Sequence, residues 1–179
     1  MSSNIKKYVL TAVTLGLIAM SGALLITGTH LITKDRIAEN ERKSIHNGIA
    51  TIYGIKDFSV LETNQVKNEN YKYITTRYVI TNNGTDPYGY VFRTSGSNNY
   101  GKISLIIGFN EDCVYQGLSV VTNEQSFAST LKKGYIDKIK DGDQTIDDVD
   151  VSCGATYGAK LVKEMVEQAE KAAKEMKGI

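Results

Sequence analysis

The sequence predicts an α+β protein in which a single N-terminal transmembrane helix and a stalk helix lead into a partly antiparallel sheet packed with helices. Three observations favour this fold. An uncharged apolar stretch lies near the N-terminus, short runs rich in Tyr, Val, Ile and Thr follow from residue 55, and an amphipathic pattern closes the chain. The 179 residues leave room for one domain of ordinary size and an anchor.

The apolar stretch runs from Tyr8 to Ile32, 25 residues without Asp, Glu, Lys or Arg. A bilayer core of ~30 Å needs about 20 helical residues, whereas the core of a signal peptide has about 7–15. No Ala-x-Ala cleavage site follows, so residues 1–33 are expected to form an uncleaved anchor. Its Ser and Thr hydroxyls either bond back to helix carbonyls or pack against other membrane helices. Basic residues flank both of its ends, so the charge count leaves the orientation open.

Three further helical segments are expected. Residues 34–54 carry isoleucines at helical spacing, mostly toward one side, and are expected to continue the anchor as a stalk helix. Phe127–Lys140 repeats apolar residues every four positions, and a final helix runs from about Gly158 to Lys177 with one apolar stripe. That stripe is typical of core packing rather than of a cofactor site. Residues 55–179 are therefore expected to form the folded domain.

The sheet is expected between the stalk and these last two helices. The strands are expected at Tyr71–Thr81, Tyr88–Thr94, Ile103–Asn110 and Val114–Thr122. Turn signals stand at Asn83-Gly84, Asp86-Pro87, Ser95-Gly96-Ser97 and Asn110-Glu111-Asp112, and the last of them indicates a tight hairpin between two apolar strands.

Charge and cysteine content exclude several classes of function. Lys and Arg total 21 against 20 Asp and Glu, so the chain offers no basic field for nucleic acid. The cysteines Cys113 and Cys153 have no partners at metal-ligand spacing, because the only histidines are His30 and His46. We therefore expect no zinc or haem site. Whether the two cysteines form a disulfide stays open.

The candidate functional site is the run Asp150-Val151-Ser152-Cys153-Gly154-Ala155-Thr156, directly before the last helix. Small residues there let a bulky group approach the backbone, and the first-turn amides of a helix have no internal partners. The helix dipole adds roughly half a positive charge, so a phosphate would be stabilised at this place. The alternative is structural, with the Thr156 hydroxyl capping the helix by accepting a backbone N–H one turn on.

At this motif the chain resembles a known family. The run fits the pattern Asp-x-x-Ser/Thr-Gly-Ala-Thr of the FMN-binding domain found in the Rnf complex G subunit and in the related C subunit of sodium-pumping NADH:quinone reductase. The anchor leading into Leu31–Glu39, the run Gly89–Phe92 and the run Tyr100–Gly108 are also similar to the G subunit, and the short chain favours it over the C subunit. The departures are Cys153 where Ser or Thr is usual, Cys113 where the hairpin usually has Gly, and Gly158 where Ser or Thr often follows.

The resemblance implies a covalent cofactor. In that family FMN is joined through its phosphate to the last threonine of the motif, here Thr156, by a separate magnesium-dependent flavin transferase that uses FAD. Asp150 then either caps the backbone of the turn or helps to hold the transferase's metal. The segment Thr122–Ser126 stands where the family has a flavin-side loop, and Glu124, Gln125 and Ser126 are its expected flavin contacts, against the alternative of an ordinary strand-to-helix turn capped by Ser126. The cofactor-binding residues expected with Thr156 are Ala155, Gly154, Cys153, Asp150, Tyr157, Glu124, Gln125 and Ser126.

The function implied by the resemblance is that of an electron-carrier subunit in an ion-translocating ferredoxin:NAD oxidoreductase, the Rnf complex. The chain has no dinucleotide fingerprint, no iron–sulfur cysteine set and no general acid–base pair, so it is not expected to be catalytic alone. Its expected partners are the other membrane subunits and the flavin transferase. The expected location is the cell membrane, with the N-terminus cytoplasmic and the FMN domain on the extracytoplasmic side.

Two alternatives stay open for this function. One is a stand-alone flavinylated surface protein that passes electrons to outside acceptors. The other is a flavin-free, membrane-anchored binding or sensor module. The sequence also leaves the coupling ion, sodium or proton, undecided.

Overall fold

The structure is a computed structural model that describes residues 3–55, 58–63, 71–82, 86–144 and 146–178. The chain divides into two compact units, Met1–Lys43 and Ser44–Ile179. One helix, α1 (Ser3–Tyr53), contributes to both units. It covers the segments for which an anchor and a stalk helix were expected.

In the first unit, α1 carries a candidate membrane span. The window Lys7–Leu24 has a mean hydropathy of 1.5, and none of it is buried, so among the described residues one helix is long and apolar enough to cross a membrane. The hydroxyls of Thr11, Thr14 and Ser21 donate to helix carbonyls three or four residues earlier, at 2.9–3.0 Å. These hydroxyls therefore bond back to the helix, as the first of the two alternatives predicts.

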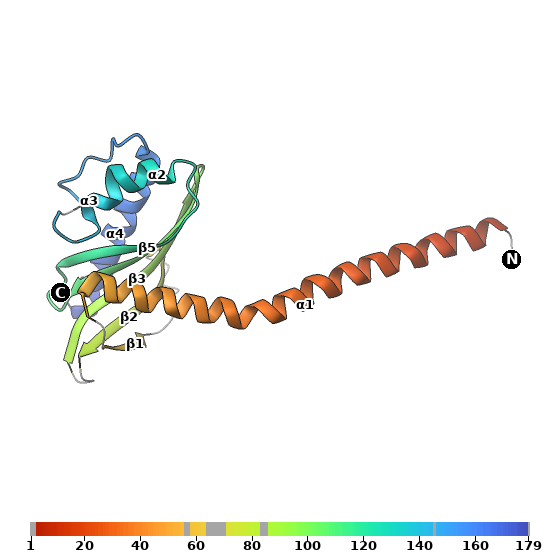
Figure 1. Cartoon of the computed structure of the whole chain (residues 1–179), viewed down its shortest axis with the longest axis horizontal. Coiled ribbons are helices and arrows are strands. Elements are labelled where there is room, and N and C mark those ends of the chain that lie inside the picture. Colours follow the sequence, from red (N-terminus) through yellow and green to blue (C-terminus); the bar gives the residue numbers. More distant parts are fainter. Residues whose placement is uncertain (1–2, 56–57, 64–70, 83–85, 145, 179) are drawn as a thin grey trace. The chain divides into compact units, whose positions relative to one another are not determined.

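The second unit is built on an antiparallel sheet of five strands in chain order (Figure 1). Every neighbouring pair is antiparallel, so the expected sheet is confirmed and the described strands are antiparallel throughout. The first strand was not among the expected ones. The strands are β1 (Ser59–Thr63), β2 (Ile74–Asn82), β3 (Asp86–Asn98), β4 (Gly101–Asn110) and β5 (Tyr115–Asn123).

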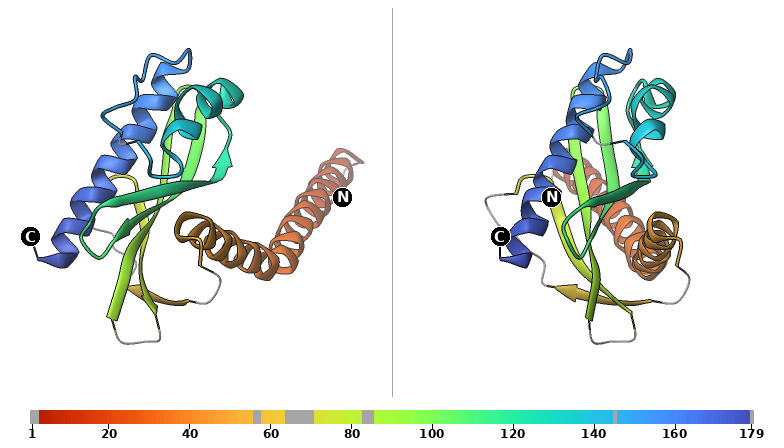
Figure 2. Two further views of the ribbon diagram at one scale, coloured as in Figure 1. Left: turned by 60° about the vertical axis from the view of Figure 1, so that its left-hand side comes forward. Right: turned by 90° about the vertical axis from the view of Figure 1, so that its left-hand side faces the viewer.

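Helices cover both faces of this sheet (Figure 2). The long C-terminal helix α4 (Thr156–Lys177) packs on one face, and the last turns of α1, from residue 44 on, pack on the other. Strand residues alternate between the two faces, as the period of two requires. In β3, for example, Phe92 joins the core under α4 while its neighbour Val91 joins the smaller core around Ile49 of α1.

A short helical segment lies beside α4 on the same face, where one helix over Phe127–Lys140 was expected. It consists of α2 (Ala128–Leu131), one π-helical turn η1 (Lys132–Ile136) and α3 (Asp137–Ile139). A Cβ at Gly134, inside the π turn, would lie 2.7 Å from Cβ of Cys153. Glycine thus lets this turn approach the motif segment closely.

Two of the expected turns are wrong. Ser95-Gly96-Ser97 lies inside β3, where a Cβ at Gly96 would stand 2.9 Å from the Leu161 side chain of α4. Glycine at this position serves close packing of helix on sheet, not a turn. Asp86-Pro87 opens β3, a place where proline is tolerated because it removes no central ladder bond. The expected turn at Asn83-Gly84 falls outside the described residues.

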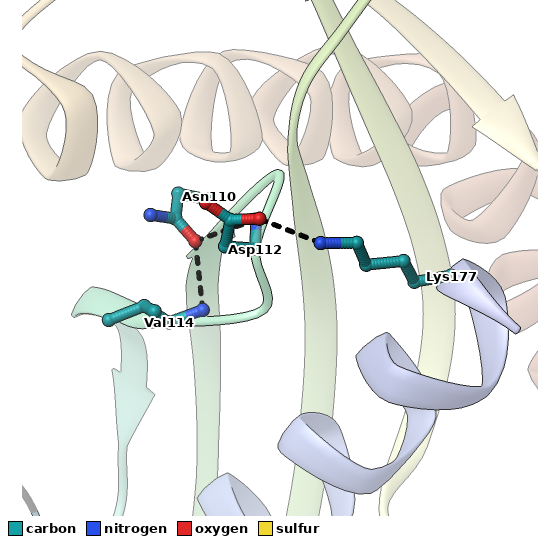
Figure 3. A network of polar contacts seen from close by, with 4 residues as sticks. All are labelled: Asn110, Asp112, Val114 and Lys177. Atoms are coloured by element: carbon teal, nitrogen blue, oxygen red, sulfur yellow. Dashed lines mark hydrogen bonds and ion pairs between the residues drawn. The ribbon is translucent and has the colours of Figure 1, made fainter. Parts of the chain in front are cut away.

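The tight hairpin expected between β4 and β5 is confirmed (Figure 3). Asn110 Oδ1 accepts the backbone N–H groups of Asp112 at 3.0 Å and of Val114 at 2.8 Å. The ammonium of Lys177, at the end of α4, lies 2.7 Å from Asp112 Oδ1. The turn is therefore closed within itself and tied to the C-terminal end of α4.

The two cysteines do not form a disulfide, since both are free. Cys113 is buried in the β4–β5 turn, where it has a φ of +61°, a conformation that favours glycine. Cys153 is half-buried and lies ahead of the first turn of α4.

Candidate functional site

A pocket of about 230 Å³ lies at the N-terminal end of α4. Four segments meet there: the β3–β4 turn, the connection from β5 to α2, α2 itself and the start of α4. The sheet brings the first of these, more than 50 residues away in sequence, against the motif segment. The lining residues are Tyr100, Gln125, Phe127, Leu131, Gly154, Ala155, Thr156, Tyr157 and Gly158.

The helix begins at Thr156, two residues earlier than expected, with Ala155 as its N-cap. The N–H of Ala159 donates to the Ala155 carbonyl at 3.0 Å, so the amides of the three residues before it precede the helical ladder. Among the described residues no side-chain hydrogen bond caps this end, and the first turn carries no acidic residue. The alternative that Thr156 is the N-cap is therefore wrong. Its hydroxyl stands at the first helical position, beside amides that the cap leaves open.

The backbone before the helix explains the small residues of the motif. Gly154 has a φ of +83°, and a Cβ there would lie 3.2 Å from the Thr130 methyl group. Ala155 is buried, with 8% of its surface exposed, so a larger side chain has little room. Asp150 Oδ1 accepts the N–H of Ser152 at 2.8 Å, which makes Asp150 a cap of the turn, as one of its two alternatives predicts.

Gly158 also has a steric reason. A Cβ at Gly158 would lie 2.9 Å from Leu131 Cδ2 and 3.4 Å from Gln125 Oε1. The Ser or Thr that often follows the motif in the resembling family would meet Leu131 here. Glycine stands at position 158 because Leu131 of α2 packs too closely on the start of α4 for a side chain there.

The expected flavin-side loop is anchored to the β3–β4 turn. Gln125 is buried and lines the pocket, and its Nε2 donates to the carbonyl of Gly101. Ser126 donates its N–H at 2.7 Å and its hydroxyl at 3.1 Å to the carbonyl of Tyr100. The N-cap of α2 is Phe127, without a side-chain cap, so the alternative of a turn capped by Ser126 is wrong. The two Ser126 bonds hold Tyr100 beside the start of α4 instead.

Four of the residues expected at the cofactor do not line the pocket: Asp150, Cys153, Glu124 and Ser126. Glu124 is exposed, and its backbone N–H donates to the Lys102 carbonyl at 2.8 Å. Cys153 packs against Gly134 and the core below α4. A hydroxyl at position 153, usual in the resembling family, would take the place of a thiol that here faces packed side chains.

Two aromatic residues of the site, Tyr100 and Phe127, were not predicted from the sequence. Tyr100 stacks on Tyr157 with ring centroids 5.4 Å apart and an interplanar angle of 26°, and it lies 6.0 Å from the Phe127 ring. All three rings line the pocket. Only Tyr157 was expected, because it is next to Thr156 in sequence, whereas nothing local indicates that Tyr100 lies across from it.

This geometry fits a phosphate ester. Open amides and an unbalanced helix dipole favour an anion, and the Thr156 hydroxyl stands where an ester could form. Within the described ranges, no group of three or more His, Cys, Asp or Glu side chains is placed to hold a metal ion. Fold and site together describe an α+β protein with a candidate membrane anchor and, at the N-terminus of its last helix, a pocket whose backbone suits an anion.

Comparison with known proteins found a family that part of the chain resembles. Residues 1–52 match the model of the family described as the RnfG N-terminal region. A search of curated proteins gave no match. The chain thus resembles the G subunit of the Rnf complex, over a segment that ends one residue before the end of α1. The match is a likeness to a subunit of the Rnf electron-transport complex and, together with the candidate span of α1, it fits a membrane-anchored protein.

Proposed function

We propose that the chain carries FMN, bound covalently through its phosphate to the Thr156 hydroxyl, and serves as an electron-carrier subunit of an ion-translocating ferredoxin:NAD oxidoreductase of the Rnf type. The observation that carries this proposal is the start of α4. It combines an esterifiable hydroxyl, first-turn backbone amides that precede the helical ladder, and an N-cap that forms no side-chain hydrogen bond within the described part of the chain. The match of residues 1–52 supports the assignment to an Rnf complex independently of this site.

Each part of the site has a stated task. The amides of residues 156–158 hold the phosphate oxygens, and Gly154 and Ala155 keep the approach to them clear. Gln125 ties the wall of the pocket to the β3–β4 turn. When bound, FMN supplies reversible uptake and release of electrons, which no side chain of this chain provides.

The size of the pocket explains why the link is covalent. At about 230 Å³ it is smaller than the ~300–1,000 Å³ of pockets that enclose a ligand. A shallow pocket retains a ligand weakly, because most of the ligand surface stays in water. A phosphodiester bond to Thr156 removes this problem and leaves the flavin ring open to redox partners. A separate magnesium-dependent flavin transferase would make the bond from FAD: the pyrophosphate of FAD is broken, the FMN phosphate joins the Thr156 oxygen, the hydroxyl loses its proton, and AMP leaves.

The remaining parts of the proposal concern the surroundings of the domain. Residues 1–33 anchor the chain, residues 34–54 form the stalk, and residues 55–179 form the FMN domain on the extracytoplasmic side, with the N-terminus in the cytoplasm. The partners that oxidise ferredoxin and reduce NAD are other membrane subunits of the complex. This chain passes electrons between them.

The test is in-gel flavin fluorescence after denaturing electrophoresis of the full-length chain, co-expressed with a flavin transferase. We expect a fluorescent band for the wild type, and none for Thr156→Ala. Thr75→Ala is the matched control, because Thr75 is exposed on β2 and does not line the pocket. A dark wild-type band, with the transferase active on another substrate, would overturn covalent FMN and favour a flavin-free module.

A second measurement separates a complex member from a stand-alone carrier. The tagged full-length chain is extracted from its native membranes in mild detergent, and the proteins that copurify with it are identified by mass spectrometry. We expect further membrane subunits of a redox complex in stoichiometric amounts. Recovery of a fluorescent protein alone would contradict membership of the complex while leaving the flavin assignment intact.

A further inference from the structure

We propose that Tyr100, Tyr157 and Phe127, together called the aromatic rim, form the surface on which the isoalloxazine ring of the FMN stacks. The inference rests on the proposed function, because it takes the flavin to be attached at Thr156. It assigns a cofactor contact to Tyr100 and Phe127, residues to which the sequence motif gives no role. It also gives Ser126 and Asn98 the task of holding the rim in place.

The first argument is the exposure of these side chains. In the described part of residues 44–179, five large hydrophobic side chains are exposed: Tyr88, Tyr100, Val114, Phe127 and Tyr157. Three of the five gather at this pocket, with exposed fractions of 39%, 52% and 65% for Tyr100, Phe127 and Tyr157. Leaving apolar rings in water is unfavourable, and a cluster of them beside a pocket marks a place where an apolar partner binds.

The second argument is that the rim is held rigidly. Asn98 Oδ1 accepts the N–H of Tyr100 at 2.8 Å, and Asn98 Nδ2 donates to the carbonyl of Tyr157 at 3.2 Å. One side chain therefore links the β3–β4 turn to the first turn of α4. Ser126 adds two hydrogen bonds to the carbonyl of Tyr100. Both backbone segments that carry the stacked rings are thus fixed before any ligand arrives.

The third argument is chemical complementarity. The isoalloxazine ring is flat and aromatic, and aromatic rings favour offset-stacked or edge-on contacts with one another. The phosphate at Thr156 fixes one end of the cofactor, so the ring can reach only what surrounds this residue. Tyr157 follows Thr156 directly, and Tyr100 already stacks on it. The rim therefore presents the right type of surface within reach of the tether.

The test uses the fluorescence of the loaded full-length protein in detergent, native and then unfolded. A tyrosine in contact with a flavin quenches its fluorescence by donating an electron to the excited ring. We expect the wild-type signal to rise severalfold on unfolding. In Tyr100→Ala and Tyr157→Ala we expect the native signal to rise about twofold or more relative to the wild type. Tyr88→Ala is the control, since Tyr88 is exposed but packs on Tyr53, outside the pocket.

A conservative variant separates contact from mere stability. Tyr100→Phe keeps the ring but loses the easily oxidised phenol, so its native fluorescence should rise while protection of the flavin from iodide stays as in the wild type. Tyr100→Ala should lose both the quenching of the flavin by the phenol and the protection of the flavin from iodide. A denaturing gel run in parallel reports covalent loading. Absence of a fluorescent wild-type band would overturn the proposed function itself, whereas loaded Tyr100 and Tyr157 variants with wild-type native fluorescence would overturn the aromatic rim.

Discussion

The two ends of α4 differ in how their backbone groups are satisfied. At the C-terminal end, Gly178 has a φ of +79° and donates its N–H to the Glu175 carbonyl at 3.2 Å. Lys174 and Lys177 stand in the last turn, where cations interact favourably with the negative end of the helix dipole. The N-terminal end has no side-chain cap and no acidic residue in its first turn. The C-terminal end of α4 thus has a backbone cap within the chain, whereas the N-cap at the other end forms no side-chain hydrogen bond.

The difference teaches where to look for a ligand. Buried or helix-terminal polar groups are normally paired, and a side-chain cap contributes about 0.5–2 kcal/mol, so a helix end without one gives up stability. At the C-terminal end of the same helix, the backbone N–H of Gly178 caps the carbonyls of Glu175 and Lys174, so the open end is not a general weakness of α4. We attribute the opening to the phosphate that the proposed function places there.

The largest effect is expected from a matched pair of variants, Gly154→Ala and Gly178→Ala. Both glycines have positive φ, +83° and +79°, so alanine is strained by ~1–2 kcal/mol at either place. Both variants should therefore lower the free energy of unfolding, Gly154→Ala somewhat more, because its Cβ also lies 3.2 Å from the Thr130 methyl group whereas a Cβ at Gly178 meets no atom within 4 Å. Only Gly154→Ala should also reduce covalent flavin loading severalfold, because its strain distorts the approach to Thr156.

Loading is measured by in-gel fluorescence per mole of full-length protein, and stability by thermal unfolding in detergent. Equal loss of flavin in the two variants would show that loading follows stability alone. That result would contradict the claim that the open N-terminal end of α4 serves flavin attachment.

A smaller effect, on loading rather than on stability, is expected from Ala155→Ser. A serine at the N-cap supplies an oxygen that can accept an open first-turn amide, but the buried position leaves little room for a larger side chain, so the free energy of unfolding should change by less than about 1 kcal/mol. The same bond competes with the phosphate, so the rate of flavin loading should fall. Thermal unfolding and a time course of loading check both parts. A faster loading rate in Ala155→Ser would contradict the role given to the open amides.

The smallest effect is expected at the other end, from Asp112→Asn. The hydrogen bond and charge of Asp112 raise the pKa of Lys177, so the pair contributes stability below the usual lysine pKa and loses it as the pH rises through the raised value. Because the Asp112 side chain is largely in solvent and that of Lys177 is one-third exposed, the variant should lower Tm by about 1–2 °C or less. High salt should remove the difference, and flavin loading should not change. A clear loss of flavin in Asp112→Asn would mean that the two ends of α4 are coupled.

Local pattern was enough for the elements that depend on neighbours in sequence. The uncharged span, the hairpin at Asn110-Glu111-Asp112 and the last helix follow from composition and periodicity, and the structure contains all three. The same reasoning failed at Ser95-Gly96-Ser97. Glycine there looks like a turn signal, but it lies in a strand because α4 passes too close for a side chain.

For the site, the sequence by itself determined the motif, with Thr156 at its end and small residues before it. Only the tertiary structure decided that Thr156 opens the helix, that Cys153 and Glu124 lie outside the pocket, and that Tyr100 lies beside Tyr157. The physical reason is range. Helix spacing and turn chemistry act over a few residues, whereas the register of β3 against β4 and the packing of α4 on the sheet bring together positions more than 50 residues apart.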